Sequence, residues 1–495
     1  MTLNDFINDS RSLLEAPAGH GKTHAIAECL SLCPDNQCKL ILTHTHAGIA
    51  SLKIKMSELK INHKKYHMET ITSFAQKYVL AYCSESDLPD QSDKDYFGVI
   101  VKKAIKLFSY SAIIDIIKIS YNGLFVDEYQ DCDISQHDMI LKLASVLPTH
   151  LLGDELQGIF TFSGETIKFD NHLADFTKYD FLQKPWRWIN KGNPELGNKI
   201  LEYRNILKRN NETVILTSVP QAHFYVVESY YELNDNNPFY YKQLRNKIKN
   251  YNCESILIIF PSYTDSRGIL RGQVGERALQ KKRFDFENHF QLIEAIDSRE
   301  FYSNAMAIDN FLANIHRARK KEKNLYDILV GLTFNKTDLN KWFDIKEGKC
   351  RIKDKRGESK VLSIKLREIC NNIIDNPSKT NILELILFFM KELRLSPKRV
   401  ELPNTILRCL QNDPENNISV YKSMQNMKNR IRRSGRKIHG KCIGTTLLTK
   451  GLEFDTVIIL DAHRFEDSKN FYVAISRACK NLIIFTKHNQ ITFTR

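Results

Sequence analysis

One short apolar run that ends in two adjacent carboxylates constrains the fold of this chain more than any other feature. Residues 125–131 read Phe-Val-Asp-Glu-Tyr-Gln-Asp and directly follow Leu124. Parallel strands buried on both faces read as short apolar runs, and their C-terminal ends are where such sheets carry out chemistry. At such an end, Asp127 is placed to hold Mg²⁺ and Glu128 to orient or deprotonate a water. An isolated Asp-Glu pair is more often two solvated acids, so the prediction needs a second motif.

That second motif lies near the N-terminus, where residues 16–23 read Ala-Pro-Ala-Gly-His-Gly-Lys-Thr. An apolar pair precedes it and a helical pattern follows, which is the strand–loop–helix context of a phosphate-binding loop. Gly19 and Gly21 allow backbone N–H groups to turn toward phosphate oxygens, and the positive helix end adds to the attraction. Lys22 can reach the β- and γ-phosphates, and the Thr23 hydroxyl can ligate Mg²⁺. Glycine loops are also common as plain turns, but the carboxylates at 127–128 favour a nucleotide site. We therefore expect the whole loop to bind nucleotide: Ala16, Pro17, Ala18, Gly19, His20, Gly21, Lys22 and Thr23.

Composition is that of a large, basic, globular protein. The chain has 495 residues, 42% of them hydrophobic, and a net charge of +14. A basic surface suits a polyanion such as nucleic acid, although a basic protein without such a partner has the same composition. The 11 cysteines are scattered without a CxxC pair, as expected for reduced thiols in the cytoplasm. The N-terminus lacks the apolar core of a signal peptide, and the longest apolar run, 385–390, is too short to span a membrane. We expect a cytoplasmic protein without a membrane partner.

The order of strand-like and helix-like segments predicts an α/β fold with two parallel-sheet domains. Strand candidates alternate with helical patterns in the first third of the chain, and strands reappear after Pro185 and again from Lys441. Between them, residues 281–435 are charged, helical in pattern and poor in glycine, which predicts an insertion as large as a domain. We expect a first domain at 1–71 and 110–184 with a short helical insertion at 72–109, and a second domain at 185–280 and 436–495 with the insertion at 281–435.

Four further segments complete an ordered set of motifs. Residues 153–164 follow a strand and read Gly-Asp-Glu-Leu-Gln-Gly-Ile-Phe-Thr-Phe-Ser-Gly, and a Trp-Arg pair stands at 186–187. Near the C-terminus, 449–455 and 472–478 read Thr-Lys-Gly-Leu-Glu-Phe-Asp and Tyr-Val-Ala-Ile-Ser-Arg-Ala. With the first two motifs, this set resembles the UvrD/Rep/PcrA branch of superfamily 1 helicases. The resemblance covers both α/β regions but not the insertions. The chain length and the motifs also resemble the helicase-like subunit of Gabija-type bacterial antiphage systems.

The resemblance implies two RecA-like domains, each with an inserted helical subdomain, that close on ATP and Mg²⁺. Lys22 matches the phosphate-binding lysine of the family. Thr23 and Asp127 match the Mg²⁺ ligands, and Glu128 matches the catalytic base. Gln157 matches the residue that contacts the γ-phosphate and the attacking water.

Residues of the second domain complete the implied ATP site. Arg187 and Arg477 match two arginines that reach the γ-phosphate, where a planar guanidinium suits the spread charge. Because these arginines come from the other domain, hydrolysis would depend on domain closure. Trp186 matches the aromatic residue that stacks on adenine, and Gly451 and Glu453 are also assigned to the nucleotide site. The alternatives are a surface ion pair for each arginine and interdomain packing for Trp186.

The resemblance also implies contacts with single-stranded DNA. Aromatic side chains stack on bases without regard to sequence, at about 1–3 kcal/mol per base. A core position is the alternative for these aromatics, and for Phe160 the two are evenly balanced. A basic run around Arg432 and Arg433 is a candidate phosphate-binding strip, with a solvated face as the alternative. The expected DNA contacts are Thr43, His44, Thr45, His46, Ser73, Phe74, Phe160, Phe162, Arg432 and Arg433.

Several positions depart from the family pattern. His44 stands where the family has Phe, His46 where it has Asn, and Leu447 where it has His. No Gln precedes the phosphate loop to contact adenine, so a preference for ATP is inferred mainly from Trp186. These departures predict an intact hydrolytic site with altered coupling to nucleic acid.

Two functions from different classes therefore stay open. The first is a DNA-stimulated ATPase that moves 3′-to-5′ on single-stranded or partly duplex DNA and unwinds it. The second is a DNA-sensing ATPase subunit that regulates a partner nuclease of the OLD type in a hetero-oligomer, as in antiphage defence. A structural protein without hydrolysis is disfavoured because the hydrolytic residues are all present.

Overall fold

The structure is a computed structural model. It describes residues 2–90, 93, 95–160, 167–209, 213–217, 224–228, 238–251, 255–285, 287, 289–294, 299–317, 320–346, 349–412, 418–434, 438 and 440–493. For Ala47, Glu85, 224–228, Arg317 and 432–434 the description covers the backbone alone. The chain forms two compact units, 1–293 with 434–495, and 294–433.

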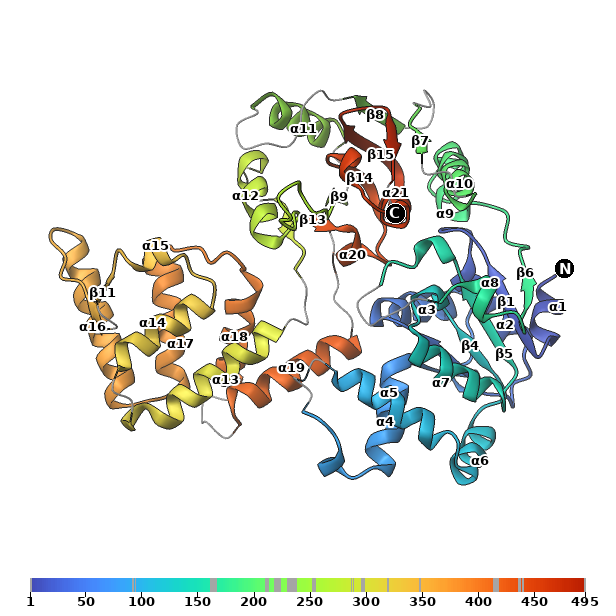
Figure 1. Ribbon diagram of the computed structural model, residues 1–495, viewed down its shortest axis with the longest axis horizontal. Coiled ribbons are helices and arrows are strands. Elements are labelled where there is room, and N and C mark those ends of the chain that lie inside the picture. Colours follow the sequence, from blue (N-terminus) through green and yellow to red (C-terminus); the bar gives the residue numbers. More distant parts are fainter. Residues whose placement is uncertain are drawn as a thin grey trace. The chain divides into compact units, whose positions relative to one another are not determined.

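The first unit contains two parallel sheets of six strands each (Figure 1). The first sheet has the order β3-β2-β4-β5-β1-β6. Its strands are β1 (Arg11–Glu15), β2 (Lys39–Thr43), β3 (Tyr66–Thr70), β4 (Leu124–Val126), β5 (Thr149–Gly153) and β6 (Thr177–Tyr179).

Each central strand of the first sheet divides its apolar residues between two cores. In β4, Leu124 and Val126 enter one core and Phe125 enters the other. Helices cover both cores, so both faces of the sheet are buried and the strands read as continuous apolar runs. One face is covered by α4 (Ile71–Tyr82), α5 (Tyr96–Leu107), α6 (Ser111–Ser120) and α7 (Ile134–Ala144), and the other by α1 (Leu3–Asn8), α2 (Lys22–Leu32) and α3 (His46–Glu58).

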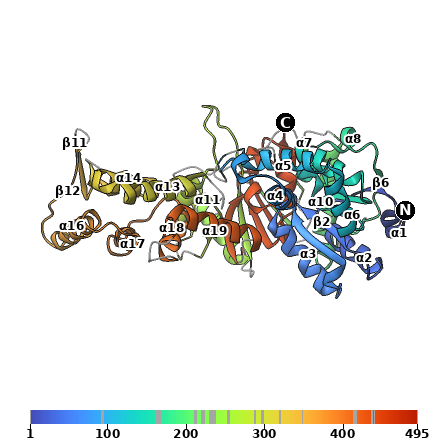
Figure 2. The ribbon, with the colours of Figure 1, turned by 90° about the horizontal axis from the view of Figure 1, so that it is seen from below.

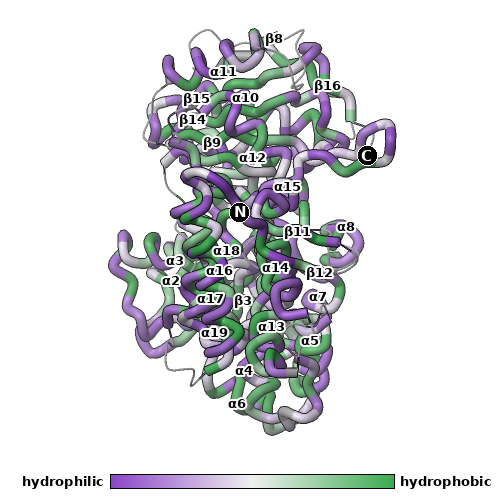
Figure 3. The backbone as a smooth tube through the Cα atoms, turned by 90° about the vertical axis from the view of Figure 1, so that its left-hand side faces the viewer, coloured by the Kyte–Doolittle hydropathy of each residue, from purple (hydrophilic) through white to green (hydrophobic). Residues whose placement is uncertain are grey.

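The second sheet repeats this design with the order β10-β13-β9-β14-β15-β8. Alternate residues of β9, β14 and β15 again face two separate cores, and green segments mark these strands in Figure 3. Its strands are β8 (Phe224–Glu228), β9 (Ile256–Phe260), β10 (Gln291–Leu292), β13 (Lys441–Thr445), β14 (Phe454–Ile459) and β15 (Ala478–Thr486). Helices α10 (Pro194–Lys208) and α21 (Ser468–Ile475) cover one face, and α11 (Pro238–Asn250) and α12 (Val274–Phe284) cover the other. A short antiparallel pair, β7 (Thr213–Ile215) with β16 (Gln490–Thr492), adjoins this domain.

The second unit, 294–433, has a core of its own. It is mainly helical, as the sequence predicted, but it also contains a hairpin that the sequence did not predict, β11 (Phe343–Lys346) with β12 (Lys349–Ile352). Its principal helices are α13 (Arg299–Asn314), α14 (Lys321–Gly331), α15 (Lys336–Leu339), α16 (Ser359–Asp375), α17 (Lys379–Leu387), α18 (Glu401–Gln411) and α19 (Val420–Ser434). Helices α13, α14 and α16 to α19 are labelled in Figure 2.

The large insertion was predicted to start at residue 281, but in the structure the second unit starts at residue 294. Residues 281–293 complete α12 and supply β10, which pairs in parallel with β13. The Ile293 N–H also donates to the Ile443 carbonyl over 2.7 Å. These residues therefore belong with the second sheet, because a strand pairing across the insertion holds them there.

The short insertion predicted at 72–109 contains most of α4 and all of α5. Phe74 and Ile100 of these helices share one core with Leu124 of the sheet. This segment therefore packs directly on the first sheet.

In the described ranges, none of the helices has both the length and the apolar character needed to cross a membrane.

Candidate functional site

The phosphate loop follows β1 and leads into α2. Gly19 and Gly21 have φ of 69° and 99°, values that favour glycine. A Cβ on Gly19 would also lie 2.8 Å from Cζ3 of Trp188. The buried Lys22 donates its Nζ to the carbonyls of Ala16 at 2.7 Å and Pro17 at 3.2 Å. The loop is therefore held in a tight turn with its lysine at the centre and the N-terminus of α2 beside it.

Asp127 lies at the end of β4, close to the start of α2. The Thr23 hydroxyl donates to Asp127 Oδ2 over 3.3 Å. Mg²⁺ prefers oxygen ligands, so the Thr23 hydroxyl and the Asp127 carboxylate could hold it here. Burial raises the pKa of Asp127 to about 7, the neighbouring Glu128 adds to the rise, and Lys22 opposes it. Bound Mg²⁺ would supply the missing positive charge.

Glu128 occupies the left-handed region with φ of 57°. A non-glycine residue rarely adopts this conformation, and such residues cluster at functional sites. Its carboxylate accepts a short hydrogen bond from Gln130 Nε2. Burial acts to raise the pKa of Glu128, but Lys22 and Lys450 outweigh it and leave that pKa below its usual value. An ionised carboxylate is the form that a general base needs.

Arg477, which lies two residues after the end of α21, reaches the first sheet. Its Nη2 lies 3.4 Å from Gln157 Oε1, and its Nε donates to the Val473 carbonyl over 3.0 Å. Burial lowers the pKa of Arg477 to about 10, and the nearby Arg187 adds to this effect. Gln157 closes the short helical turn η4 (Glu155–Gln157) after β5 and is also buried. The structure thus brings together two predicted site residues that are 320 positions apart in the chain.

Arg187 lies in the short helix α9 (Trp186–Ile189), beside the phosphate loop. Its backbone N–H donates to the Gly19 carbonyl over 3.0 Å, and its guanidinium pairs with Glu453 at 2.8 Å. Burial acts to lower the pKa of Arg187, but Glu453 outweighs it and raises that pKa. Glu453 therefore neutralises an arginine of the site. Gly451 is exposed in an open turn with φ of 79°.

The two tryptophans of α9 have different environments. Trp186 is 44% exposed, and its Cδ1 would lie 3.5 Å from a Cβ on Gly21. Its ring is therefore close to the phosphate loop and partly exposed, with Lys184 Nζ 5.5 Å from the ring centre. Trp188 is fully buried and donates its indole N–H to the Ala478 carbonyl over 2.7 Å. The packing role considered for Trp186 belongs to Trp188, which the sequence analysis missed although it stands two residues away.

Lys450 is a second residue that sequence reasoning missed. Its Nζ makes short hydrogen bonds to the Asp131 carboxylate and the Gln157 carbonyl. The same Nζ lies 4.7 Å from the centre of the Phe160 ring. Lys450 thus joins the end of the 125–131 motif to the segment that follows β5. The Lys-Gly pair at 450–451 was the available signal, but local sequence does not identify a partner more than 300 residues away.

The expected DNA contacts have mixed surroundings. His44 is partly exposed, with Nε2 3.5 Å from Cys132 Sγ. Burial, helped by Lys450, lowers the pKa of His44 to about 3, so its ring is neutral at pH 7. Thr45 caps α3 by accepting the Gly48 N–H over 3.1 Å. His46 is the first residue of α3.

Phe74 corrects the predicted DNA surface. Its side chain is fully buried and packs against Tyr78, Phe108 and Tyr121. The predicted base contact is therefore wrong for Phe74, because helix α4 turns this residue into the sheet core. Its neighbour Ser73 is partly exposed and accepts the Thr70 hydroxyl over 2.7 Å.

Of the remaining candidates, Thr43 is buried at the end of β2, and Phe160 is partly exposed beneath Lys450. Phe162 lies outside the described residues. Arg432 and Arg433 belong to α19, and only their backbone is described. Lys428, from the same basic run, is buried with its Nζ over the Phe301 ring. The basic run is therefore not a uniform solvated strip.

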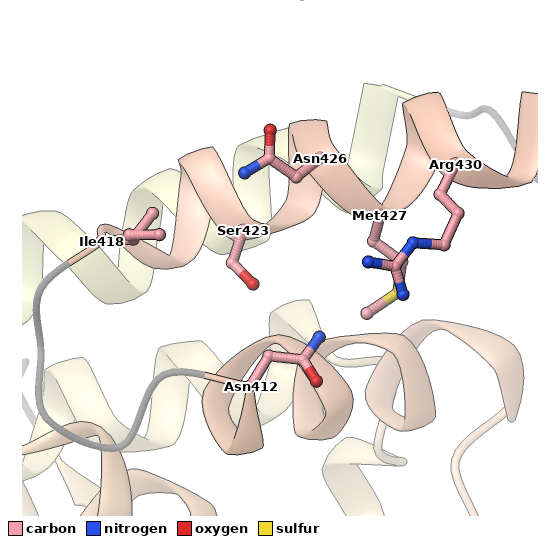
Figure 4. A pocket seen from close by; sticks show the side chains of 6 residues that line it. All are labelled: Asn412, Ile418, Ser423, Asn426, Met427 and Arg430. Atoms are coloured by element: carbon pink, nitrogen blue, oxygen red, sulfur yellow. The ribbon is translucent and has the colours of Figure 1, made fainter.

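A cavity of about 300 Å³ lies in the second unit, between the end of α18 and helix α19 (Figure 4). Its walls come from α19 and from residues on either side of 413–417. None of the residues assigned to ATP lines it. The lining residues are Asn412, Ile418, Ser423, Asn426, Met427 and Arg430.

Comparison with known proteins agrees with this site. Residues 90–177 match the model of the UvrD/REP helicase N-terminal domain, a range that includes both 125–131 and Gln157. No curated protein matches the chain. Among solved structures, the Pif1 helicase from Candida albicans is similar at 12% identity and a TM-score of 0.26, over 50% of this chain. The similar region spans about half of that protein, 52% of its chain. Residues 90–177 therefore match a UvrD/REP helicase N-terminal domain, and the two parallel sheets are consistent with two RecA-like domains.

Proposed function

We propose that this chain hydrolyses ATP with Mg²⁺ and uses the cycle to move along single-stranded DNA in the 3′-to-5′ direction. One observation carries the proposal. Arg477 of the second sheet reaches Gln157 of the first, within the same buried region as the phosphate loop and the strand-end carboxylates. An ATPase whose groups come from two sheets turns over only when both are together, so hydrolysis can drive their relative movement.

Each side chain has a defined task in this proposal. The phosphate-loop N–H groups and Lys22 would hold the phosphates, and Thr23 and Asp127 would hold Mg²⁺, which would supply positive charge against the phosphates. Glu128 accepts a proton from the attacking water, which Gln157 orients. Arg187 and Arg477 stabilise the negative charge that spreads over the transferred phosphoryl group. The exposed ring of Trp186 stacks on the base.

Lys450 offers a route from nucleic acid to this site. It contacts both the Phe160 ring and the Gln157 carbonyl. A base that displaces Phe160 would change the environment of Lys450, and Lys450 would transmit that change to Gln157.

Steady-state ATPase activity with and without single-stranded DNA tests the proposal, with Glu128→Gln as the matched inactive control. We expect stimulation by DNA and a loss of turnover in Glu128→Gln, with nucleotide binding retained. Partial duplexes with a 3′ or a 5′ tail then report direction, since the proposal requires unwinding from the 3′ tail. Turnover in Glu128→Gln close to wild type would contradict the assignment of the base.

A second function is favoured by the state of the expected DNA contacts. Phe74 and Thr43 are buried, the Thr45 hydroxyl is used as a helix cap and the His44 ring carries no charge, so fewer groups than expected offer a stacking or charged contact to a strand. In this alternative, the chain is a DNA-sensing ATPase that regulates a partner nuclease of the OLD type in a Gabija-like antiphage complex. ATPase activity that DNA does not change, together with no unwinding of either tailed duplex, would favour it.

A further inference from the structure

Asp154 is a buried carboxylate shared by three side chains. It follows β5 and has no exposed surface. Arg204 of α10 donates its Nη2 to Oδ1 over 2.8 Å and its Nε to the same oxygen over 3.1 Å. Gln157 donates its Nε2 to Oδ2 over 3.1 Å, and the Tyr472 hydroxyl donates to Oδ2 over 3.0 Å. Burial acts to raise the pKa of Asp154, but Arg204 and Lys22 outweigh it, so the carboxyl is ionised.

Tyr472 links this carboxylate to the phosphate loop. The Ala18 N–H donates to the Tyr472 hydroxyl over 3.0 Å. A hydroxyl has one proton, so it accepts from Ala18 and donates to Asp154. Ala18 and Asp154 belong to the first sheet, whereas Tyr472 belongs to α21 of the second. This bridge therefore exists only when α21 lies against the phosphate loop.

The carboxylate also decides which way the Gln157 amide points. An ionised carboxylate only accepts hydrogen bonds, so the NH₂ group of Gln157 must face Asp154. Its Oε1 then faces the opposite way, toward Arg477 Nη2 at 3.4 Å. A carbonyl oxygen in that position can accept a hydrogen from a water, whereas a flipped amide would present N–H groups to the water and to the arginine.

We propose that Asp154 and Tyr472 are positioning residues that hold the Gln157 amide with its oxygen toward the attacking water, and that Tyr472 makes this depend on packing of α21 against the phosphate loop. The inference rests on the proposed ATPase function. A closed arrangement would complete the Ala18–Tyr472–Asp154 bridge, fix the amide and permit hydrolysis. An open arrangement would lose the bridge and leave the amide free to turn.

Tyr472→Phe is the principal test because it removes one hydroxyl and keeps the buried ring. Tyr240→Phe is the matched control, since Tyr240 is also fully buried and its hydroxyl also donates to a buried aspartate, Asp461, over 3.3 Å. Steady-state ATPase gives kcat and KM for each full-length variant, a non-hydrolysable ATP analogue gives affinity, and thermal unfolding gives Tm. The same tyrosine variants are also made in a Gln157→Ala background.

We expect Tyr472→Phe to lower kcat by about ten- to hundredfold, the effect of one lost hydrogen bond to a charged group, with affinity unchanged. Tyr240→Phe should shift Tm by a similar amount and leave kcat near wild type. In the Gln157→Ala background, Tyr472→Phe should cause no further loss, since both changes remove the same function. Asp154→Asn, whose amide can donate toward Gln157, should lower kcat further.

Two results would overturn the inference. One is a kcat for Tyr472→Phe within twofold of Tyr240→Phe, and the other is an equal loss of kcat with and without Gln157. Both are separate from a failure of the proposed function, because Glu128→Gln would still abolish turnover. If Glu128→Gln keeps its turnover, the ATPase assignment itself is wrong.

Discussion

At the scale of single residues, the most important contacts are ion pairs between buried charges that lie far apart in the chain. The side chain of Asp131 is 2% exposed and that of Lys450 is 7% exposed, and the two form an ion pair. Removing one member of such a pair leaves the other buried and unpaired, which costs about 3–5 kcal/mol. The pair therefore ties the strand-end motif of the first sheet to the second.

Lys450→Met should lower the free energy of unfolding by about 3 kcal/mol, measured by urea denaturation. Burial already raises the pKa of Asp131 to about 7, and Lys450 opposes that rise. Without the lysine, the pKa of Asp131 in the folded state rises further above its value in the unfolded state. Stability then falls as pH increases through the interval between these two pKa values. The destabilisation should be greater at about pH 8.5 than at about pH 6.

Asp131→Asn in the Lys450→Met background is the control for this effect. The neutral amide has no charge to bury, so the double variant should recover part of the stability and lose the added pH dependence. A Lys450→Met variant that unfolds like wild type at both pH values would show that the pair does not stabilise the fold.

At the scale of helices, a helix cap gives a structural role to Thr45, a residue that the family resemblance assigns to DNA binding. Thr45 was expected to contact DNA, and its hydroxyl accepts the Gly48 N–H at the start of α3. Thr45→Ala should lower the free energy of unfolding by about 1 kcal/mol, and Thr45→Ser, which keeps the cap, should restore it. Chemical denaturation of the three proteins measures the effect. Equal stability of Thr45→Ala and wild type would contradict the capping role.

Charge reversal in helix α19 can show whether the basic run binds phosphate. Lys428 is buried over Phe301, so any DNA contact must come from other positions of the run, such as Arg432 and Arg433. Reversing the charge of both arginines should weaken DNA binding and flatten the dependence of affinity on salt. Fluorescence anisotropy with a labelled single strand at several salt concentrations gives the slope.

The matched control reverses the exposed Lys336 and Lys341, which add the same charge change in the same unit. The salt slope of this control should stay at the wild-type value. If reversing the charges of Arg432 and Arg433 left the salt dependence of DNA affinity unchanged, the basic run would be a solvated face that does not bind phosphate.

At the scale of the whole molecule, the second unit has what an independent domain needs. Residues 294–433 have their own core, which includes Phe301, Leu366 and Leu402. We expect this fragment, produced alone, to unfold cooperatively in urea with helical circular dichroism. A non-hydrolysable ATP analogue should raise the Tm of the full chain and leave that of the fragment unchanged. A fragment without a cooperative transition would mean that the insertion needs the rest of the chain to fold.

The local geometry of the candidate nucleotide site was largely predictable because its signals lie close together in the sequence. The phosphate loop needs glycine at positive φ between a strand and a helix, and residues 16–23 meet that need within eight positions. The strand-end carboxylates likewise follow their strand directly. The fold class followed from strands that are apolar on both faces, a pattern visible in β4 and β14 without any knowledge of their neighbours.

The sequence by itself determined the two parallel sheets, the loop that suits phosphate and the carboxylates that suit Mg²⁺, because short-range geometry requires these residue types at these spacings. Only the tertiary structure decided that Phe74 faces a core, that Trp188 rather than Trp186 packs, and that Lys450 and Tyr472 reach the first sheet. Those outcomes depend on contacts between residues that are tens to hundreds of positions apart. The sequence shows which side chains can make such contacts, but the partner of each one depends on how the sheets and helices pack.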